Sequence, residues 1–206
     1  MKQTFGARMS NWDDEANPWT VKGVSQRFAN PWFSVEEHDA VNPGGGRSHY
    51  GVIRFRKHAV GVLPLDADGV VHMVGQWRFP LARYSWEMPE GGAEPGENLE
   101  ECARRELAEE SGFAAARLER ILEMDLSNSV TDEHATVFLA TGLTPGAPAP
   151  EEVEALKSHS APFQDVLARV VDGRIRDAMT VAAMLRLHHM AVTGSLPPGL
   201  ARAILA

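Results

Sequence analysis

Glutamates are concentrated in one short part of this chain. The segment from Glu94 to Glu110 holds seven glutamates and two arginines, a local charge of −5 in a protein whose formal net charge is −8. A charge run of this kind on a helix is usually a solvated face. Here, however, Glu106, Glu109 and Glu110 are adjacent or one helical turn apart, so their carboxylates project to one side of the helix. Arg105 cannot neutralise all three, whereas a hard cation such as Mg²⁺ or Mn²⁺ would.

The elements around these glutamates are predicted to present them to a ligand. Leu99, Cys102, Ala103 and Leu107 recur at helical intervals, so we expect a helix over 98–111 whose apolar face lies opposite the glutamates. Asn98 is the expected N-cap, and Gly112 the expected stop. Upstream, residues 89–92 are predicted to form a tight turn whose glycines let the backbone approach a ligand closely.

The same residues match a long motif with rigid spacing. Gly91 is followed after five residues by Glu97, and after seven more by the run Arg105 to Phe113. This pattern resembles the Nudix box at every specified position. The resemblance implies a loop–helix–loop within an α/β/α sandwich, and a site that binds divalent cations for the hydrolysis of a pyrophosphate bond.

Similarity to this family extends over most of the chain, from about Trp32 to Leu187. The segments 76–80 and 85–92 resemble the approach to the box in ADP-ribose and nucleoside-diphosphate-sugar pyrophosphatases, and 171–180 resembles a C-terminal signature of that group. Many members that prefer ADP-ribose carry Ser-Pro-Gly shortly after the box, where this chain has residues 127–133 without a proline. Other nucleotide sugars therefore remain open as substrates.

The resemblance also assigns roles to individual residues. The implied metal ligands are the backbone carbonyl of Glu90 and the side chains of Glu106 and Glu110, with Glu109 as an additional or alternative ligand that also counts among the catalytic residues. Glu97 would support the metal site, and Arg105 would orient the glutamates through a salt bridge. The residues expected at the substrate are Arg78, Trp32 and Glu133.

A general base is expected outside the box. Related enzymes place acidic residues on a loop before the last helices, and counting back from Gly173 aligns Glu152 and Glu154 with them. We favour Glu152 as the base and Glu154 as loop or metal support. The alternative is that this acidic loop is merely solvated.

Composition restricts the class of partner and the compartment. The 206 residues suffice for one large domain with its own core. An acidic chain is a poor binder of nucleic-acid backbones, so no nucleic-acid partner is expected. No apolar leader and no stretch near 20 apolar residues is present, which indicates a cytoplasmic protein without a membrane partner. The single cysteine, Cys102, excludes an intrachain disulfide and is expected to be a small core residue.

Elsewhere the hydrophobic pattern predicts strands mixed with a few helices. The predicted strands are 32–41, 49–55, 58–65, 70–79, 117–125 and 136–141, and the predicted helices after the box are 162–171 and 178–191, followed by a Pro-Pro-Gly break and a short apolar tail. The expected fold class is α/β: a Nudix α/β/α sandwich over 57–206 with an added N-terminal antiparallel β-hairpin region over 1–56. By resemblance, the N-terminal strands exchange between the subunits of a homodimer.

Three functions are compatible with the box. The leading one is Mg²⁺-dependent hydrolysis of ADP-ribose or a related nucleotide sugar to a nucleoside monophosphate and a sugar phosphate. A nucleoside-triphosphate sanitising hydrolase needs only the compact core, so the N-terminal region and the Gly173 signature disfavour it. A nucleotide-sensing regulator without catalysis has little need for three crowded carboxylates.

Overall fold

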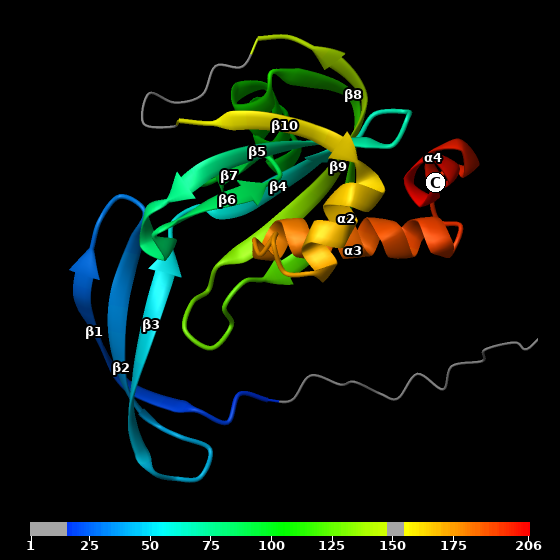
Figure 1. Ribbon diagram of the computed structural model, residues 1–206. Helices are drawn as coiled ribbons and strands as arrows, with labels where there is room; N and C mark the ends of the chain where they lie inside the picture. Colours follow the sequence, from blue (N-terminus) through cyan, green and yellow to red (C-terminus); the bar gives the residue numbers. More distant parts are fainter. Residues whose placement is uncertain (1–15, 148–154) are drawn as a thin grey trace, which may run out of the picture.

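The computed structural model describes residues 16–147 and 155–206 (Figure 1). Its strands are β1 (Thr20–Ala29), β2 (Phe33–Val41), β3 (Arg47–Phe55), β4 (His58–Pro64), β5 (Val70–Arg78), β6 (Arg83–Glu87), β7 (Glu90–Ala93), β8 (Phe113–Asp125), β9 (His134–Pro145) and β10 (Lys157–Pro162). A short 3₁₀ turn, η1 (Phe79–Leu81), follows β5, and a π turn, η2 (Leu107–Ser111), precedes β8. Its helices are α1 (Leu99–Glu106), α2 (Phe163–Val171), α3 (Ala178–Val192) and α4 (Pro198–Leu205).

The centre of the fold is a four-stranded sheet of order β7-β4-β9-β8, in which β4 and β9 are parallel. Side chains alternate between the two faces of a strand, so Val60 and Val62 of β4 pack under α1, whereas Leu63 faces the opposite core. Strand β9 alternates in the same way, with Phe138 on the α1 side and Val137 on the other. A sheet covered on both faces requires continuous apolar strands, which explains the unbroken apolar runs in the sequence.

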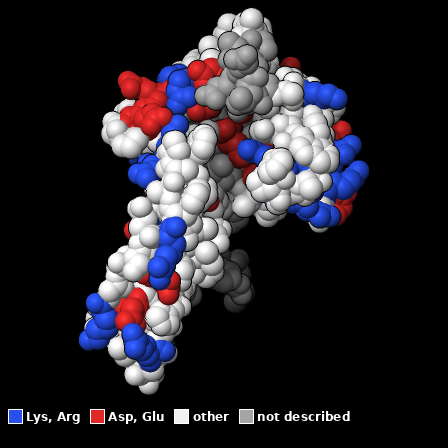
Figure 2. All heavy atoms as spheres, turned by 90° about the vertical axis from the view of Figure 1, so that its left-hand side faces the viewer, with Lys and Arg blue, Asp and Glu red and all other residues white. Residues whose placement is uncertain are grey.

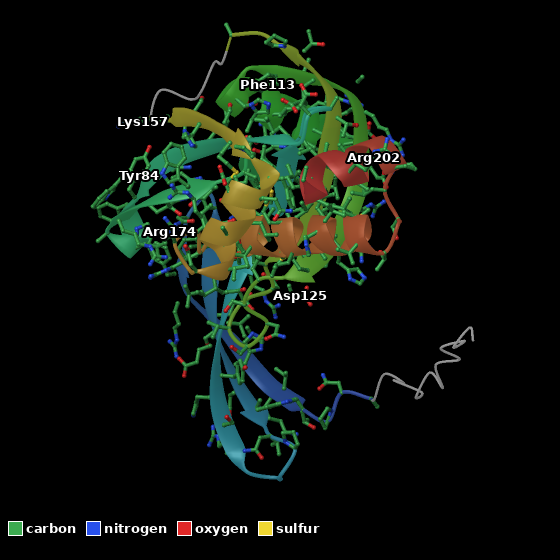
Figure 3. The ribbon with its side chains drawn as sticks, turned by 45° about the vertical axis from the view of Figure 1, so that its right-hand side comes forward. Tyr84, Phe113, Asp125, Lys157, Arg174 and Arg202 are labelled. Carbon is green, nitrogen blue, oxygen red and sulfur yellow. The ribbon has the colours of Figure 1, made fainter. Side chains whose placement is uncertain are left out.

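The second face of this sheet carries most of the core. Helices α2, α3 and α4 cover it, contributing among others Phe163, Met184 and Ile204, all of which are fully buried. A three-stranded sheet of order β10-β5-β6 completes this layer, and Lys157 of β10 lies over the ring of Tyr84 in β6, 5.8 Å from the ring centroid (Figure 3). The arrangement confirms the predicted α/β/α sandwich.

The N-terminal strands form a separate antiparallel sheet of order β1-β2-β3 that extends away from the sandwich (Figure 1). Every residue of β1 is exposed. The sheet is attached through the loop before β9: the Tyr50 hydroxyl donates to the Ser129 carbonyl over 2.5 Å, and Arg54 pairs with Asp132 over 3.3 Å. The predicted hairpin is thus present, with β1 as an additional strand. The division of the chain at residues 56 and 57 stays a prediction.

Several segments differ from the sequence-based expectation, since strands β6 and β10 are not predicted and two further segments have another structure than expected. A tight turn is predicted over residues 89–92, but residues 90–93 form strand β7, because their backbone pairs with β4 from Gly61↔Glu90 to His58↔Ala93. The apolar tail after the Pro-Pro-Gly break is helix α4, which begins at Pro198. Proline is tolerated in a first helical turn because the N–H that it lacks has no helical acceptor there. Within the described part of the chain, we find no helix with the length and apolar character needed to span a membrane.

Candidate active site

The box helix is anchored by its cap and by its apolar face. The Asn98 side chain accepts hydrogen bonds from the backbone N–H groups of Glu100 and Glu101, over 2.8 and 3.3 Å, as an N-cap does. Cys102 is fully buried between α1 and the sheet, and burial raises the pKa of its thiol to about 12. This anchoring confirms the core role predicted for Cys102, and it leaves the glutamate face of the helix turned toward β7.

Glu106 and Glu110 lie where α1 meets β7, and both are buried, at 8% and 3% exposure. The last turn of the helix, η2, is a π turn that ends at Gly112, whose φ is 75°. Glu110 accepts a hydrogen bond from the backbone N–H of Glu90 over 3.0 Å. A Cβ at Gly91 would lie only 2.2 Å from the Glu106 carboxyl carbon, so this position needs glycine for the strand to approach the helix so closely.

Arg105 pairs with three glutamates, of which Glu106 is buried and Glu97 and Glu109 are more exposed. Its guanidinium is 2.6 Å from Glu106 Oε1, 3.2 Å from Glu109 Oε2 and 3.3 Å from Glu97 Oε1. The carboxylate of Glu97 also accepts the backbone N–H of Glu94 over 2.8 Å, and this bond, followed by the charge of Arg105, holds the pKa of Glu97 below its ordinary value. The arginine therefore bridges the start of the helix to its glutamate face.

This donor set fits a hard divalent cation. Two carboxylates, those of Glu106 and Glu110, are buried against residues 91 and 90 of β7. Arg105, which pairs with Glu106, is shared with Glu97 and Glu109. Oxygen ligands of this kind are preferred by Mg²⁺ and Mn²⁺, and binding would relieve the repulsion between the carboxylates.

Arg78 lies in a second ion-pair cluster on the other side of β7. Its Nε and Nη2 donate to both oxygens of Glu87, and its Nη2 also donates to Glu90 Oε1 over 2.5 Å. Burial raises the pKa of Glu90 well above its ordinary value, and the neighbouring charges of Asp177 and Glu87 raise it further, against the opposing effect of Arg78. Arg78 is therefore already engaged by carboxylates, although a third of its side chain remains exposed.

The two clusters face two connected cavities of about 560 and 800 Å³, seen as the hollow with acidic atoms at its base in Figure 2. Five residues line both cavities, namely Ala59, Arg78, Glu90, Gly91 and Glu133. The larger cavity is bordered by Trp32 and Phe55 and by three of the box glutamates, Glu97, Glu106 and Glu109. The smaller one is bordered by Glu87, Asp177 and apolar groups such as Leu81. A single elongated ligand could therefore occupy both.

The sequence-predicted residues converge on these cavities to different extents. Trp32, 63% exposed, lines the larger cavity from the N-terminal sheet. Glu133 lies between the cavities, and burial, together with the nearby Asp132 charge, raises its pKa. Glu152 and Glu154 lie outside the described residues.

Sequence reasoning missed Glu87 and Asp177 as members of the site. Glu87 stands in a segment that resembles the approach to the box, and Asp177 stands in the C-terminal signature, where its side chain caps α3 by accepting the Thr180 N–H over 2.7 Å. An acid just before a predicted helix signals a cap. Nothing local signals that it meets Glu87 across the fold.

Comparison with known proteins defines the class to which this fold and site belong. The model of the NUDIX domain matches residues 55–180. The chain belongs to the Nudix family, and it is a Nudix hydrolase.

Two similar relatives have the same name. The ADP-ribose pyrophosphatase of Mycobacterium tuberculosis is 31% identical over 169 residues, which cover 81% of this chain and 81% of that protein. The ADP-ribose pyrophosphatase of Bacillus subtilis is 33% identical over 154 residues, covering 75% and 77%. A crystal structure of an ADP compounds hydrolase shares the fold, with a TM-score of 0.78 and 22% identity over 89% of this chain and 100% of that one.

Proposed function

We propose that this protein hydrolyses the pyrophosphate bond of ADP-ribose, or of a closely related nucleoside diphosphate sugar, with Mg²⁺ as its cofactor and Mn²⁺ as a possible replacement. The products are a nucleoside monophosphate and a sugar phosphate. The observation that carries the proposal is the buried pair Glu106 and Glu110, which contacts residues 90 and 91, because these two residues line both cavities and Glu106 itself lines the larger one. The names of the relatives support the choice of substrate.

In this proposal the box residues hold the cation. Its ligands are Glu106, Glu110 and the backbone carbonyl of Glu90, with Glu109 beside them. When bound, the cation supplies positive charge that withdraws electron density from the pyrophosphate. Arg105 keeps the carboxylates in position through its ion pairs, and Glu97 in turn holds Arg105. These two residues act by positioning rather than by touching the substrate.

The two cavities differ in the part of the substrate that each suits. Trp32 and Phe55 give the larger cavity aromatic faces on which a base can stack, and stacking is tolerant of base identity. The smaller cavity has no aromatic residue among the described residues that line it, but it combines carboxylates and arginines with apolar groups. We therefore place the nucleoside in the larger cavity and the sugar of the distal phosphate in the smaller one, with Arg78 and Glu133 between them.

Removal of the water proton is assigned to Glu152, with Glu154 in support. The box glutamates are poor bases while they hold a cation, so a separate carboxylate is needed. Glu152→Gln should lower kcat by about 10²-fold or more while KM changes little, because proton transfer stabilises the transition state only. Wild-type turnover in both Glu152→Gln and Glu154→Gln would show that the base lies elsewhere.

A twofold homodimer forms part of the proposal. The outer strand β1 exposes Val21, Val24 and Phe28, each more than half exposed, which is more apolar area than an edge strand normally leaves in water. A second copy of this chain would cover these residues. Light scattering at micromolar concentration should give a dimer mass, and a monomer mass would refute this part alone.

The function is tested with a substrate panel and phosphatase-coupled phosphate detection. The panel contains ADP-ribose, other nucleotide sugars and nucleoside triphosphates, and the reaction is repeated in ¹⁸O-labelled water. ADP-ribose or a nucleotide sugar should be the best substrate, with the label on a phosphate because water attacks phosphorus. Preference for a triphosphate would identify a sanitising enzyme instead, and tight nucleotide binding without turnover would identify a sensor.

A further inference from the structure

Three carboxylates that do not belong to the box gather on one wall of the smaller cavity. Glu87 at the end of β6, Glu90 at the start of β7 and Asp177 before α3 each offer an oxygen, and these oxygens all lie within 4.8 Å of one another. Glu87 is only 2% exposed, and the Glu90 side chain is 11% exposed. All three line the cavity, so an ion could reach them from solvent.

The charges of this cluster do not balance. Among the described residues, the ion pairs of these three acids all come from Arg78, which leaves a net charge of −2 when each acid is ionised. Arg78 donates to both oxygens of Glu87 and to Oε1 of Glu90. Burying unbalanced charge is costly, so a further positive partner is favoured here.

One oxygen of the cluster has no partner. Within the described part of the chain, Glu90 Oε2 is shielded from solvent and accepts no hydrogen bond. Leaving a buried polar atom without a hydrogen-bond partner costs free energy, so a ligand for this oxygen is favoured. Asp177 uses Oδ2 to cap α3 through Thr180, so its carboxylate is held in place within the cluster. A buried oxygen without a partner thus belongs to a residue of this group of acids.

We propose that Glu87, Glu90 and Asp177 form a second divalent-cation site, separate from the site on the box helix. Carboxylate oxygens from three segments suit a hard ion such as Mg²⁺ or Mn²⁺, and the charge of such an ion balances the −2 of the cluster. Three carboxylates leave coordination positions open toward the cavity for water or for a ligand oxygen.

Residue 90 connects the two sites. Its backbone N–H donates to Glu110 of the box, whereas its side chain belongs to the new cluster. Occupancy of the second site would therefore hold β7 at the position from which it contacts the box helix. Ion binding at this cluster does not depend on hydrolysis. The second site can therefore be absent while the proposed hydrolysis holds, and it can be present if the proposed hydrolysis is wrong.

The test is Mn²⁺ binding by the full-length protein, read without substrate. Crystals soaked in Mn²⁺ should show an anomalous peak among Glu87, Glu90 and Asp177 in addition to a peak at Glu106 and Glu110. In solution, Mn²⁺ counted by electron paramagnetic resonance should fall by one ion per chain in Glu90→Ala. That variant keeps the backbone carbonyl assigned to the box site, so the box peak should persist.

Matched variants separate the two sites. Asp177→Asn retains a capping oxygen and therefore the fold, yet it should lose the same ion as Glu90→Ala. Glu133→Gln removes a carboxylate from the same cavity but from outside the cluster, and should keep both ions. Glu110→Gln should lose the box ion only. Absence of a peak at the cluster while the box site is filled, or an unchanged ion count in both Glu90→Ala and Asp177→Asn, would overturn the proposal.

Discussion

The box cluster and the Arg78 cluster have similar composition but opposite electrostatic behaviour. Each places one arginine among several carboxylates. In the box cluster the Arg105 and Glu109 side chains are more than a third exposed, and the pKa of Glu97 is lowered. In the Arg78 cluster the acids are almost completely buried, and the pKa of Glu90 is raised. The difference between the two carboxyl groups is that burial raises the pKa of Glu90, whereas the backbone N–H of Glu94 and the charge of Arg105 lower the pKa of the more exposed Glu97.

The largest expected effect concerns activity and the box cluster. Glu110→Gln keeps the shape of the side chain but removes a charge from the proposed metal site, so turnover should fall by at least about 10²-fold while the fold survives. Glu106→Gln should lower turnover to a similar extent. Turnover is measured at saturating Mg²⁺ with Glu123→Gln, an exposed carboxylate outside both cavities, as the control. Full activity of Glu110→Gln would remove the basis for the metal assignment.

The second largest expected effect is on the free energy of unfolding, and it distinguishes Arg78 from Arg105. Arg78→Met leaves Glu87 and Glu90 buried without a counter-charge, which should reduce the free energy of unfolding by about 2 kcal/mol or more. Arg105→Met leaves one buried carboxylate, that of Glu106, while water still reaches Glu97 and Glu109, so its cost should be smaller, about 1 kcal/mol. Urea unfolding of both variants, in EDTA to exclude metal, gives the difference. Equal losses would mean that burial does not distinguish the clusters.

The smallest effect concerns pH. In the folded chain the pKa of Glu90 is raised above its ordinary value of 4.5. The stability that the protonated carboxyl group contributes is therefore fully present below pH 4.5, and it is lost as the pH rises through the raised pKa. Glu90→Gln is neutral at every pH, so its melting temperature relative to the unmodified chain should rise as the pH is raised above 4.5.

Glu97 gives the opposite pH dependence. Its pKa is lowered, so the stability that its carboxylate contributes is present above 4.5 and is lost as pH falls through the lowered pKa. The difference between Glu97→Gln and the unmodified chain should therefore shrink on acidification. Thermal scans of the two variants across the same buffers, without metal, test both directions, and parallel curves for the two would contradict the comparison.

Much of the box could be predicted because its geometry is local. A helix places residues four apart on one face, so the sequence alone predicted that Glu106 and Glu110 project to the same side and that Cys102 turns to the core. Asn98 and Gly112 marked the ends of the segment for similarly local reasons. The long motif and the alternating apolar strands were sufficient for the α/β/α sandwich.

The other features of the fold and of the site depend on contacts between segments that are distant in the sequence. Residues 90–93 carry the glycines of a turn, and only pairing with β4 makes them a strand. The cluster of Glu87, Glu90 and Asp177 joins residues as many as 90 positions apart, so no spacing in the sequence reveals it. Arg78, expected at the substrate, was found paired with buried acids for the same reason. Helix geometry is set within a few residues, whereas strand pairing and burial are set by the whole chain, and these decide which charges meet and whether water reaches them.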